Sequence, residues 1–112
     1  MVPRMTTSAT GLLTEMGISP NYLGYNYVFY GLELIESDSD YLYGITKKLY
    51  VEIAKKYNCT PASVEKNIRN VISIAFKKGN KETLKSIFQQ NTEPPSNQSF
   101  FIALYYYLFY SN

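Results

Sequence analysis

Apolar residues recur every three or four positions in two adjacent stretches near the middle of the chain, residues 47–57 and 61–78. This period is typical of amphipathic α-helices, which bury their apolar face against a core. The second stretch stops at Gly79, a residue type that commonly follows the end of a helix. The pattern therefore predicts two consecutive helices. Their inward positions are Leu49, Tyr50, Ile53, Ala54 and Tyr57 in the first helix, and Val64, Ile68, Val71, Ile72 and Ala75 in the second.

The two predicted helices are joined by a short turn that begins at Asn58. Asn58 tolerates the left-handed conformation that ends a helix, Thr60 can cap the next helix, and Pro61 suits its first position. This arrangement is that of a helix-turn-helix, whose second helix enters the major groove of DNA. The alternative is an ordinary αα-hairpin in a helical domain, because apolar positions alone report only a core.

The outward-facing residues of the second helix favour DNA binding. Lys and Arg bind guanine, Asn binds adenine and Glu binds cytosine, and this face mixes these types instead of pairing Glu with Lys. We therefore expect a recognition helix at about residues 61–78, with lysines near the turn and at its end on phosphates. The candidate base-reading residues are Ser63, Glu65, Lys66, Asn67, Arg69 and Asn70, and the candidate phosphate contacts are Lys55, Lys56, Thr60, Lys77 and Lys78.

The flanking segments complete an all-α fold of about six helices with the helix-turn-helix at its centre. A length of 112 residues allows one compact domain, expected at residues 11–112, and residues 1–10 are expected to be a disordered linker or tag remnant. Gly24 should mark close packing between helices. Before the central helices we expect a short helix from Thr14 ended by Gly17, a helix opened by Pro20 that runs to Ser37 with Leu23 inside, and a short helix or turn at 41–46. After them we expect a helix at 81–90, a loop at 91–97 and a final helix from about Asn97.

The final helix is apolar on all sides between Phe100 and Tyr110. This run of 11 residues is too short to span a bilayer and lacks the basic face of a membrane-surface helix, so no membrane association is expected. The apolar surface of this helix must instead be buried against other protein surface. Two interpretations remain open: the helix caps the core and leaves some tyrosines half exposed, or it mediates self-association through Tyr106, Phe109 and Tyr110.

Charge and composition narrow the function further. The net charge of +2 is small, but every Lys and Arg other than Arg4 falls within residues 47–85, around the two central helices. Histidine is absent and Cys59 is the single cysteine, so neither a disulfide within the chain nor a metal cluster can form. We expect no enzymatic activity and no cofactor, since the usual general base and nucleophile pair are missing. A reducing, cytoplasmic location is consistent with this composition.

The central segment EIAKKYNCTPASVEKNIRNVISIAFKKGN, residues 52–80, closely resembles the effector domains of the stage-zero sporulation response regulators, transcription factors of endospore-forming bacteria. The segments LLTEMGISPNYLGYNYV, ITKKLY, ETLKSIF and PSNQSFFIA resemble the same family in the same order. The resemblance implies binding to double-stranded DNA at a short box similar to TGTCGAA, often in tandem. It also makes RNA polymerase and a homodimer on tandem sites, formed through the last helix, candidate partners. In the family a receiver domain precedes the effector domain; these 112 residues contain none, so we expect either an excised effector domain or a stand-alone effector.

Several positions depart from the family pattern. Ser63 and Lys66 stand where the family has arginines and Asn70 where it has histidine, whereas Glu65 and Arg69 match. We expect a changed base preference, because lysine lacks the fork that makes arginine bidentate on guanine. The tail helix is tyrosine-rich instead of charged. A second function therefore stays open, that of a relative with impaired DNA binding that acts as a protein-interaction module through its aromatic C-terminal helix.

Overall fold

The computed structural model describes the backbone of residues 4–89 and 93–110, and within these ranges the side chains from Ala9 onward. The described part of the chain contains six α-helices, two short helical turns and no strand, which confirms the predicted all-α fold. The elements are α1 (Arg4–Glu15), α2 (Leu23–Ser37), a 3-10 turn η1 (Ser39–Tyr43), a π-helical turn η2 (Ile45–Leu49), α3 (Tyr50–Tyr57), α4 (Pro61–Lys78), α5 (Lys81–Phe88) and α6 (Asn97–Phe109).

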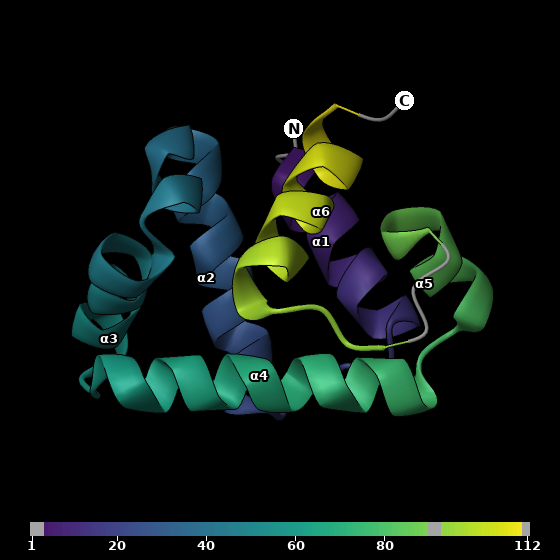
Figure 1. Cartoon of the computed structure of the whole chain (residues 1–112), viewed down its shortest axis with the longest axis horizontal. Helices are drawn as coiled ribbons and strands as arrows, with labels where there is room; N and C mark the ends of the chain where they lie inside the picture. The colour runs from purple at the N-terminus through teal and green to yellow at the C-terminus, as the bar shows by residue number, and fades with distance from the viewer. Residues whose placement is uncertain (1–3, 90–92, 111–112) are drawn as a thin grey trace.

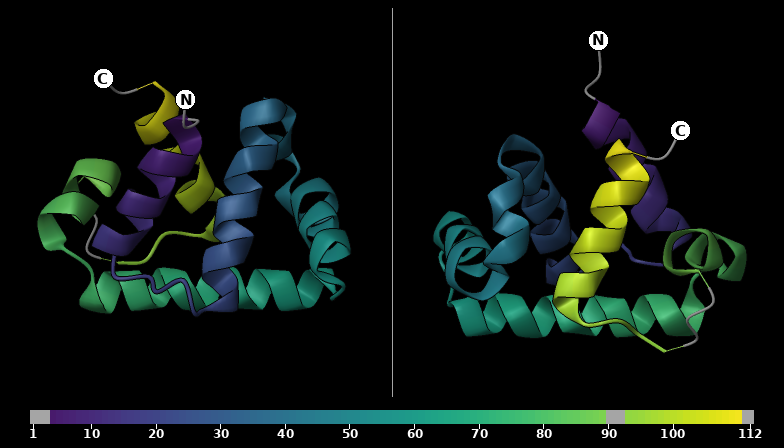
Figure 2. Two further views of the ribbon diagram at one scale, coloured as in Figure 1. Left: turned by 180° about the vertical axis from the view of Figure 1, so that it is seen from behind. Right: turned by 45° about the horizontal axis from the view of Figure 1, so that its top comes forward.

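Helix α4 forms one edge of the molecule, and the other helices lie on one side of it (Figure 1). It has 18 residues and is therefore about 27 Å long. Helix α3 lies near its N-terminal end, α2 and α6 stand over its middle, and α5 lies near its C-terminal end, an arrangement also visible from behind (Figure 2). One face of α4 is thus packed along its length and the opposite face is uncovered.

The core is built from all six helices. Each of the five apolar positions predicted to face inward on α4 is buried, and so are four of the five predicted on the helix before it. The fifth, Tyr57, is 37 % exposed, so its assignment to the core was wrong. Its ring lies against Tyr27 and Tyr30, with centroids 5.1 and 6.2 Å apart, because it ends α3 at the rim of the core. The largest fully buried side chains are Phe100, Phe101, Leu13, Met16, Ile18, Leu32, Ile35, Leu49, Ile53, Ile68, Ile72 and Leu104.

The N-terminal helix begins earlier than the sequence predicted. Helix α1 starts at Arg4, so residues 4–10 of the expected disordered linker or tag remnant are helical, and residues 1–3 lie outside the described part. Ala9 is fully buried in this helix, followed by Leu13 and Met16 at helical spacing. The sequence signal is weak because Thr and Ser before Ala9 are poor helix formers on their own, and the described apolar side chains of the helix, from Ala9 onward, pack into the core.

The second helix begins later than predicted. Pro20 does not open it, and α2 starts at Leu23, which is 56 % exposed instead of lying inside. The reason is a turn held by Ser19: its hydroxyl accepts a hydrogen bond from the Asn21 N–H at 3.2 Å, and its carbonyl accepts one from the Tyr22 N–H at 3.1 Å. The predicted end of the short first helix is correct, since Gly17 adopts a left-handed conformation with φ of 78°.

The remaining elements lie close to their predicted positions. The turn expected at residues 41–46 is found as η1 and the start of η2, and α5 ends at Phe88, before Gln89. The carboxylate of Asp38 accepts a hydrogen bond from the Asp40 N–H at 3.0 Å, which caps η1. The predicted loop at 91–97 is non-helical over residues 93–96, and residues 91 and 92 lie outside the described part.

Candidate nucleic-acid interface

The turn between α3 and α4 has the geometry that its residues predicted. Asn58 adopts φ of 54° and ψ of 53°, the left-handed conformation, and the Cys59 N–H donates to the carbonyl of Ala54 at 3.0 Å. The Thr60 hydroxyl accepts a hydrogen bond from the Ser63 N–H at 3.1 Å, and Pro61 is the first residue of α4. The local sequence therefore ends one helix and starts the next within three residues.

The uncovered face of α4 carries most of the predicted base-reading residues. Lys66, Arg69 and Asn70 are exposed, and Ser63 is half-buried beside them. They lie opposite the buried positions Val64, Ile68, Val71, Ile72 and Ala75 and share one open surface with Ala62 and Ser73. Lys77 follows Ser73 by four residues, close to one helical turn, and so continues this face toward the C-terminal end.

Glu65 and Asn67 lie on opposite flanks of this face: Asn67 still lines the open surface, whereas Glu65 does not. Both are half-buried. The Asn67 amide donates a hydrogen bond to the carbonyl of Ser63 at 2.8 Å, within the helix. The Glu65 carboxylate forms an ion pair with Arg69 one turn later, and both side chains are partly exposed. An exposed ion pair of this kind contributes about 1 kcal/mol or less to stability, so Arg69 can leave Glu65 for another partner at little cost in free energy.

The predicted phosphate contacts form two groups at the two ends of α4. Lys55 and Lys56 lie in the last turn of α3, and Lys77 and Lys78 in the last turn of α4, all four exposed. Lys55 pairs with Glu52 at 3.4 Å, and the Lys56 ammonium lies 4.9 Å from the centre of the Tyr30 ring. The Thr60 hydroxyl accepts from Ser63 and keeps its own proton to donate.

Three tyrosines, Tyr50 and Tyr57 of α3 and Tyr27 of α2, remain neutral at ordinary pH. Burial raises the pKa of Tyr50 and of Tyr57 above the usual value. Burial, assisted by a contact of 3.6 Å between the Tyr27 hydroxyl and Cys59 Sγ, raises the pKa of Tyr27 to about 12. These tyrosine hydroxyls therefore add no negative charge near the lysines predicted to contact phosphates.

One polar residue of the site was missed by sequence reasoning. Asn97 opens α6, far along the chain, yet its Nδ2 lies 2.9 Å from the Tyr50 hydroxyl and 3.1 Å from the Glu65 carbonyl. Its neighbour Gln98 donates to the carbonyl of Leu42 at 3.0 Å. No spacing in the sequence signals these contacts, because 47 and 32 residues separate Asn97 from its two partners.

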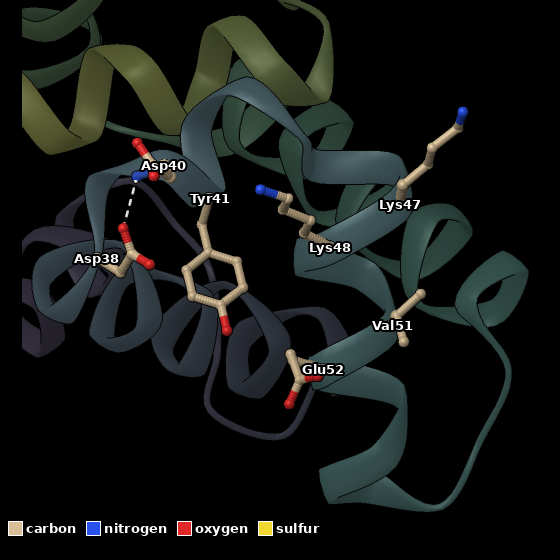
Figure 3. A pocket seen from close by; sticks show the side chains of 7 residues that line it. All are labelled: Asp38, Asp40, Tyr41, Lys47, Lys48, Val51 and Glu52. Carbon is tan, nitrogen blue, oxygen red and sulfur yellow. Dashed lines mark hydrogen bonds between the residues drawn. The ribbon is translucent and has the colours of Figure 1, made fainter.

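A hollow of about 220 Å³ lies beside η1, η2 and the start of α3 (Figure 3). Charged side chains of both signs line it, and Asp38 is already engaged in its cap. Among the described side chains, no group of three or more Asp, Glu, Cys and His residues is arranged to hold a metal ion. The lining residues are Asp38, Asp40, Tyr41, Lys47, Lys48, Val51 and Glu52.

The C-terminal helix presents two different faces. Phe100, Phe101, Leu104 and Leu108 are buried in the core, as expected of a helix that caps it. On the other side, Tyr106 and Tyr110 are 50 % and 63 % exposed, and Phe109 is half-buried. No described helix is long and apolar enough to cross a membrane.

The exposed side of α6 is an aromatic cluster centred on Tyr105. Its ring centroid lies 5.2 to 5.5 Å from those of Tyr106, Phe109 and Tyr110. The hydroxyls of Tyr105 and Tyr110 lie 3.4 Å apart, and this hydrogen bond is the main reason that the pKa of Tyr105 rises to about 12. The cluster consists of rings whose apolar faces remain partly in water.

Comparison with known protein families agrees with this geometry. The family model described as "Sporulation initiation factor Spo0A C terminal" matches residues 9–108. The match covers most of α1, all of α2 to α5 and nearly all of α6, including the turn and both helices of the helix-turn-helix. The family is one of DNA-binding transcription factor domains involved in sporulation, not a family of enzymes. The chain therefore belongs to the family of the C-terminal domain of the sporulation initiation factor Spo0A.

Proposed function

We propose that this domain binds double-stranded DNA sequence-specifically, with α4 in the major groove, and regulates transcription in sporulation. The observation that carries the proposal is that one face of α4 is uncovered, whereas its other face packs into the core. A helix with its side chains is about 10–12 Å across, which suits a major groove about 12 Å wide. The edge position of α4 supports this placement, because the other helices lie on one side of it.

The proposed roles follow from position on α4. Lys66, Arg69 and Asn70 are the central base-reading candidates, because they are exposed on its outer face. Ser63 supplements them near the N-terminal end. Glu65 and Asn67 are candidates for the groove edge, because they flank this face. The phosphate candidates are Lys55, Lys56 and Thr60 at one end and Lys77 and Lys78 at the other.

The proposed target is a short box similar to TGTCGAA, with altered preference at the base pairs met by Ser63, Lys66 and Asn70. A homodimer on tandem boxes is the proposed assembly, with Tyr106, Phe109 and Tyr110 at the contact between subunits. The partly exposed aromatic cluster on α6 supports this contact between subunits, since tyrosine is enriched in interfaces. RNA polymerase is a candidate partner of the DNA-bound form, and a cytoplasmic location follows from the proposed ligand.

A titration with labelled duplexes tests this function. The domain is added to a duplex carrying the family box and to a scrambled duplex of equal composition, at several salt concentrations. We expect tighter binding to the box, and affinity for both duplexes that falls steeply with salt as counterions are released. Equal affinity for the two duplexes would contradict sequence-specific recognition, and affinity independent of salt would contradict the phosphate contacts.

The aromatic cluster favours a second candidate function, a protein-interaction module that has lost DNA binding. Tyr106 and Tyr110 are 50 % and 63 % exposed and adjoin Tyr105 and Phe109, so the aromatic surface on α6 is contiguous. The same titration separates the two functions. A module of this kind would bind neither duplex at physiological salt while still associating through α6.

A further inference from the structure

The first turn of α6 ties three helices together through one amide group. Asn97 is half-buried, and its Nδ2 donates one hydrogen to the Tyr50 hydroxyl at 2.9 Å and the other to the Glu65 carbonyl at 3.1 Å. Tyr50 begins α3 and Glu65 lies in the second turn of α4. Tyr50 is only 3 % exposed, so its ring is fixed by the core and gives the amide a rigid anchor.

The bond to Glu65 acts on the turn of α4 that presents Arg69. In an α-helix the carbonyl of residue i accepts the N–H of residue i+4, so the carbonyl of Glu65 also serves Arg69. A carbonyl oxygen has two lone pairs, and Asn97 occupies the second from outside the helix. The side chains of Glu65 and Arg69 form their ion pair on the same turn. Asn97 thus holds this turn from behind without touching the outer face of α4.

We propose that Asn97 is a positioning residue for the DNA-reading face, fixing α4 against α3 and α6. This inference rests on the proposed DNA-binding function. Contacts to base edges require side chains held within about 0.5 Å, whereas attraction to phosphates tolerates looser placement. Loss of the two Asn97 hydrogen bonds therefore weakens binding to the preferred box and leaves binding to scrambled DNA nearly unchanged.

The adjacent residue provides a matched control. Gln98 also lies in the first turn of α6 and also donates to a backbone carbonyl, that of Leu42 in η1. Replacing either residue with Ala removes a side-chain amide of similar kind from the same turn. Of the two substitutions, only Asn97→Ala removes a hydrogen bond to α4. The difference in DNA affinity between the two variants therefore reports what that bond contributes.

The experiment compares the parent chain, Asn97→Ala, Gln98→Ala and Tyr50→Phe at a temperature well below unfolding. For Asn97→Ala we expect affinity for the box to fall about three- to tenfold, the range expected when one or two hydrogen bonds are removed. Affinity for the scrambled duplex should change less than about twofold, as should both affinities of Gln98→Ala. Tyr50→Phe removes the anchor and keeps the bond to Glu65, so its loss of affinity should be smaller than that of Asn97→Ala.

Amide hydrogen exchange gives a readout that needs no DNA. The Arg69 amide should exchange faster in Asn97→Ala, by about threefold or more, and at the parent rate in Gln98→Ala. Equal effects of the two alanine variants, or equal losses of affinity on the box and the scrambled duplex, would overturn the proposal. If Asn97→Ala fails to fold, Tyr50→Phe decides: unchanged discrimination and unchanged exchange at Arg69 would also overturn it. If the parent does not prefer the box, the proposed function fails, and the exchange rate alone shows whether Asn97 holds α4.

Discussion

Gly24 of α2 lies directly against the backbone of Asn67 in α4. A Cβ atom added to Gly24 would lie 2.3 Å from the carbonyl oxygen of Asn67 and 2.6 Å from Cγ1 of Val71. The close packing predicted for this glycine is confirmed. Because the nearest atom belongs to the backbone, no side chain can move aside to relieve the clash. The distance between α2 and α4 is therefore set at the turn that carries Asn67.

Replacing Gly24 with Ala should destabilise the domain. The added methyl forces α2 and α4 apart, and overpacking of this kind costs about 1–3 kcal/mol, more than the gain in helix propensity of up to about 1 kcal/mol. Gly11 is the control, since it is also helical and a Cβ there would meet nothing within 4 Å. Gly11→Ala should stabilise by about 0.5–1 kcal/mol. Urea unfolding of both variants measures this, and a stabilised Gly24→Ala would refute the close contact.

Substitutions on the outer face of α4 should separate base readers from phosphate-binding residues. Lys66→Ala should cost about 1–3 kcal/mol on the preferred box and relax preference at one base pair, whereas removal of a phosphate-binding charge weakens all duplexes alike. Lys66→Arg should strengthen binding where guanine lies opposite, because it restores the bidentate fork. Lys85→Ala removes the same charge from α5 and serves as the control. Binding by Lys66→Ala equal to that of the parent would exclude Lys66 as a base reader.

The lysines that end α4 should determine part of the salt dependence. In the double variant Lys77→Ala, Lys78→Ala, the slope of log affinity against log salt should become shallower by about 0.9 for each phosphate that is no longer neutralised. The ratio of affinities for box and scrambled duplex should stay near that of the parent, because phosphate contacts carry no base preference. Anisotropy titrations at four or more salt concentrations give both quantities. An unchanged slope would mean that the C-terminal end of α4 lies away from the DNA.

The aromatic side of α6 should mediate self-association. Changing Tyr106, Phe109 and Tyr110 to Ser keeps the four buried residues of α6 and removes only the partly buried Phe109 from the edge of the core, so the domain should stay folded. The variant should show less association at high concentration and less cooperative binding to tandem boxes. Tyr22→Ser, at an exposed tyrosine before α2, is the control. Sedimentation of the parent decides the matter: a strict monomer, both free and on tandem boxes, would assign α6 to the core alone.

Tyr27 should contribute to loss of stability at alkaline pH. Its pKa is about 12 in the folded protein and about 10 when exposed, so the folded state favours the neutral phenol. The resulting stability is present in full below about pH 10 and is lost as the pH rises from about 10 to 12. Tyr27→Phe should therefore flatten the fall of unfolding free energy in this window, with Cys59 present in both proteins. Parallel curves for the two proteins would contradict this contribution.

The helix-turn-helix was predictable because its determinants are local. Asn58, Thr60 and Pro61 each specify a backbone conformation or a cap within four residues, and the apolar period of α4 is regular. The face of α4 that carries Lys66 and Asn70 follows from the same period. The features that were predicted well are therefore those determined by residues that are neighbours in the sequence.

Features that depend on distant contacts were missed. Helix α1 begins at Arg4 although Thr and Ser are poor helix formers, because its apolar side meets the core. Tyr57 has the spacing of an inward residue but lies where α3 ends at the rim of the core. Asn97 reaches Glu65 only because α6 crosses over α4 in space. In each case the deciding partner is far away along the chain.

The uncovered face of α4 separates the buried residues that maintain the fold from the exposed residues proposed to read the DNA. Positions 62, 66, 69 and 70 are exposed, so substitutions there leave the core packing intact. Under the proposed function, single mutations at these positions should change operator preference without unfolding the domain. A combinatorial library at these four positions would sample many specificities on one scaffold, which makes the domain suitable for directed evolution of reprogrammed regulators.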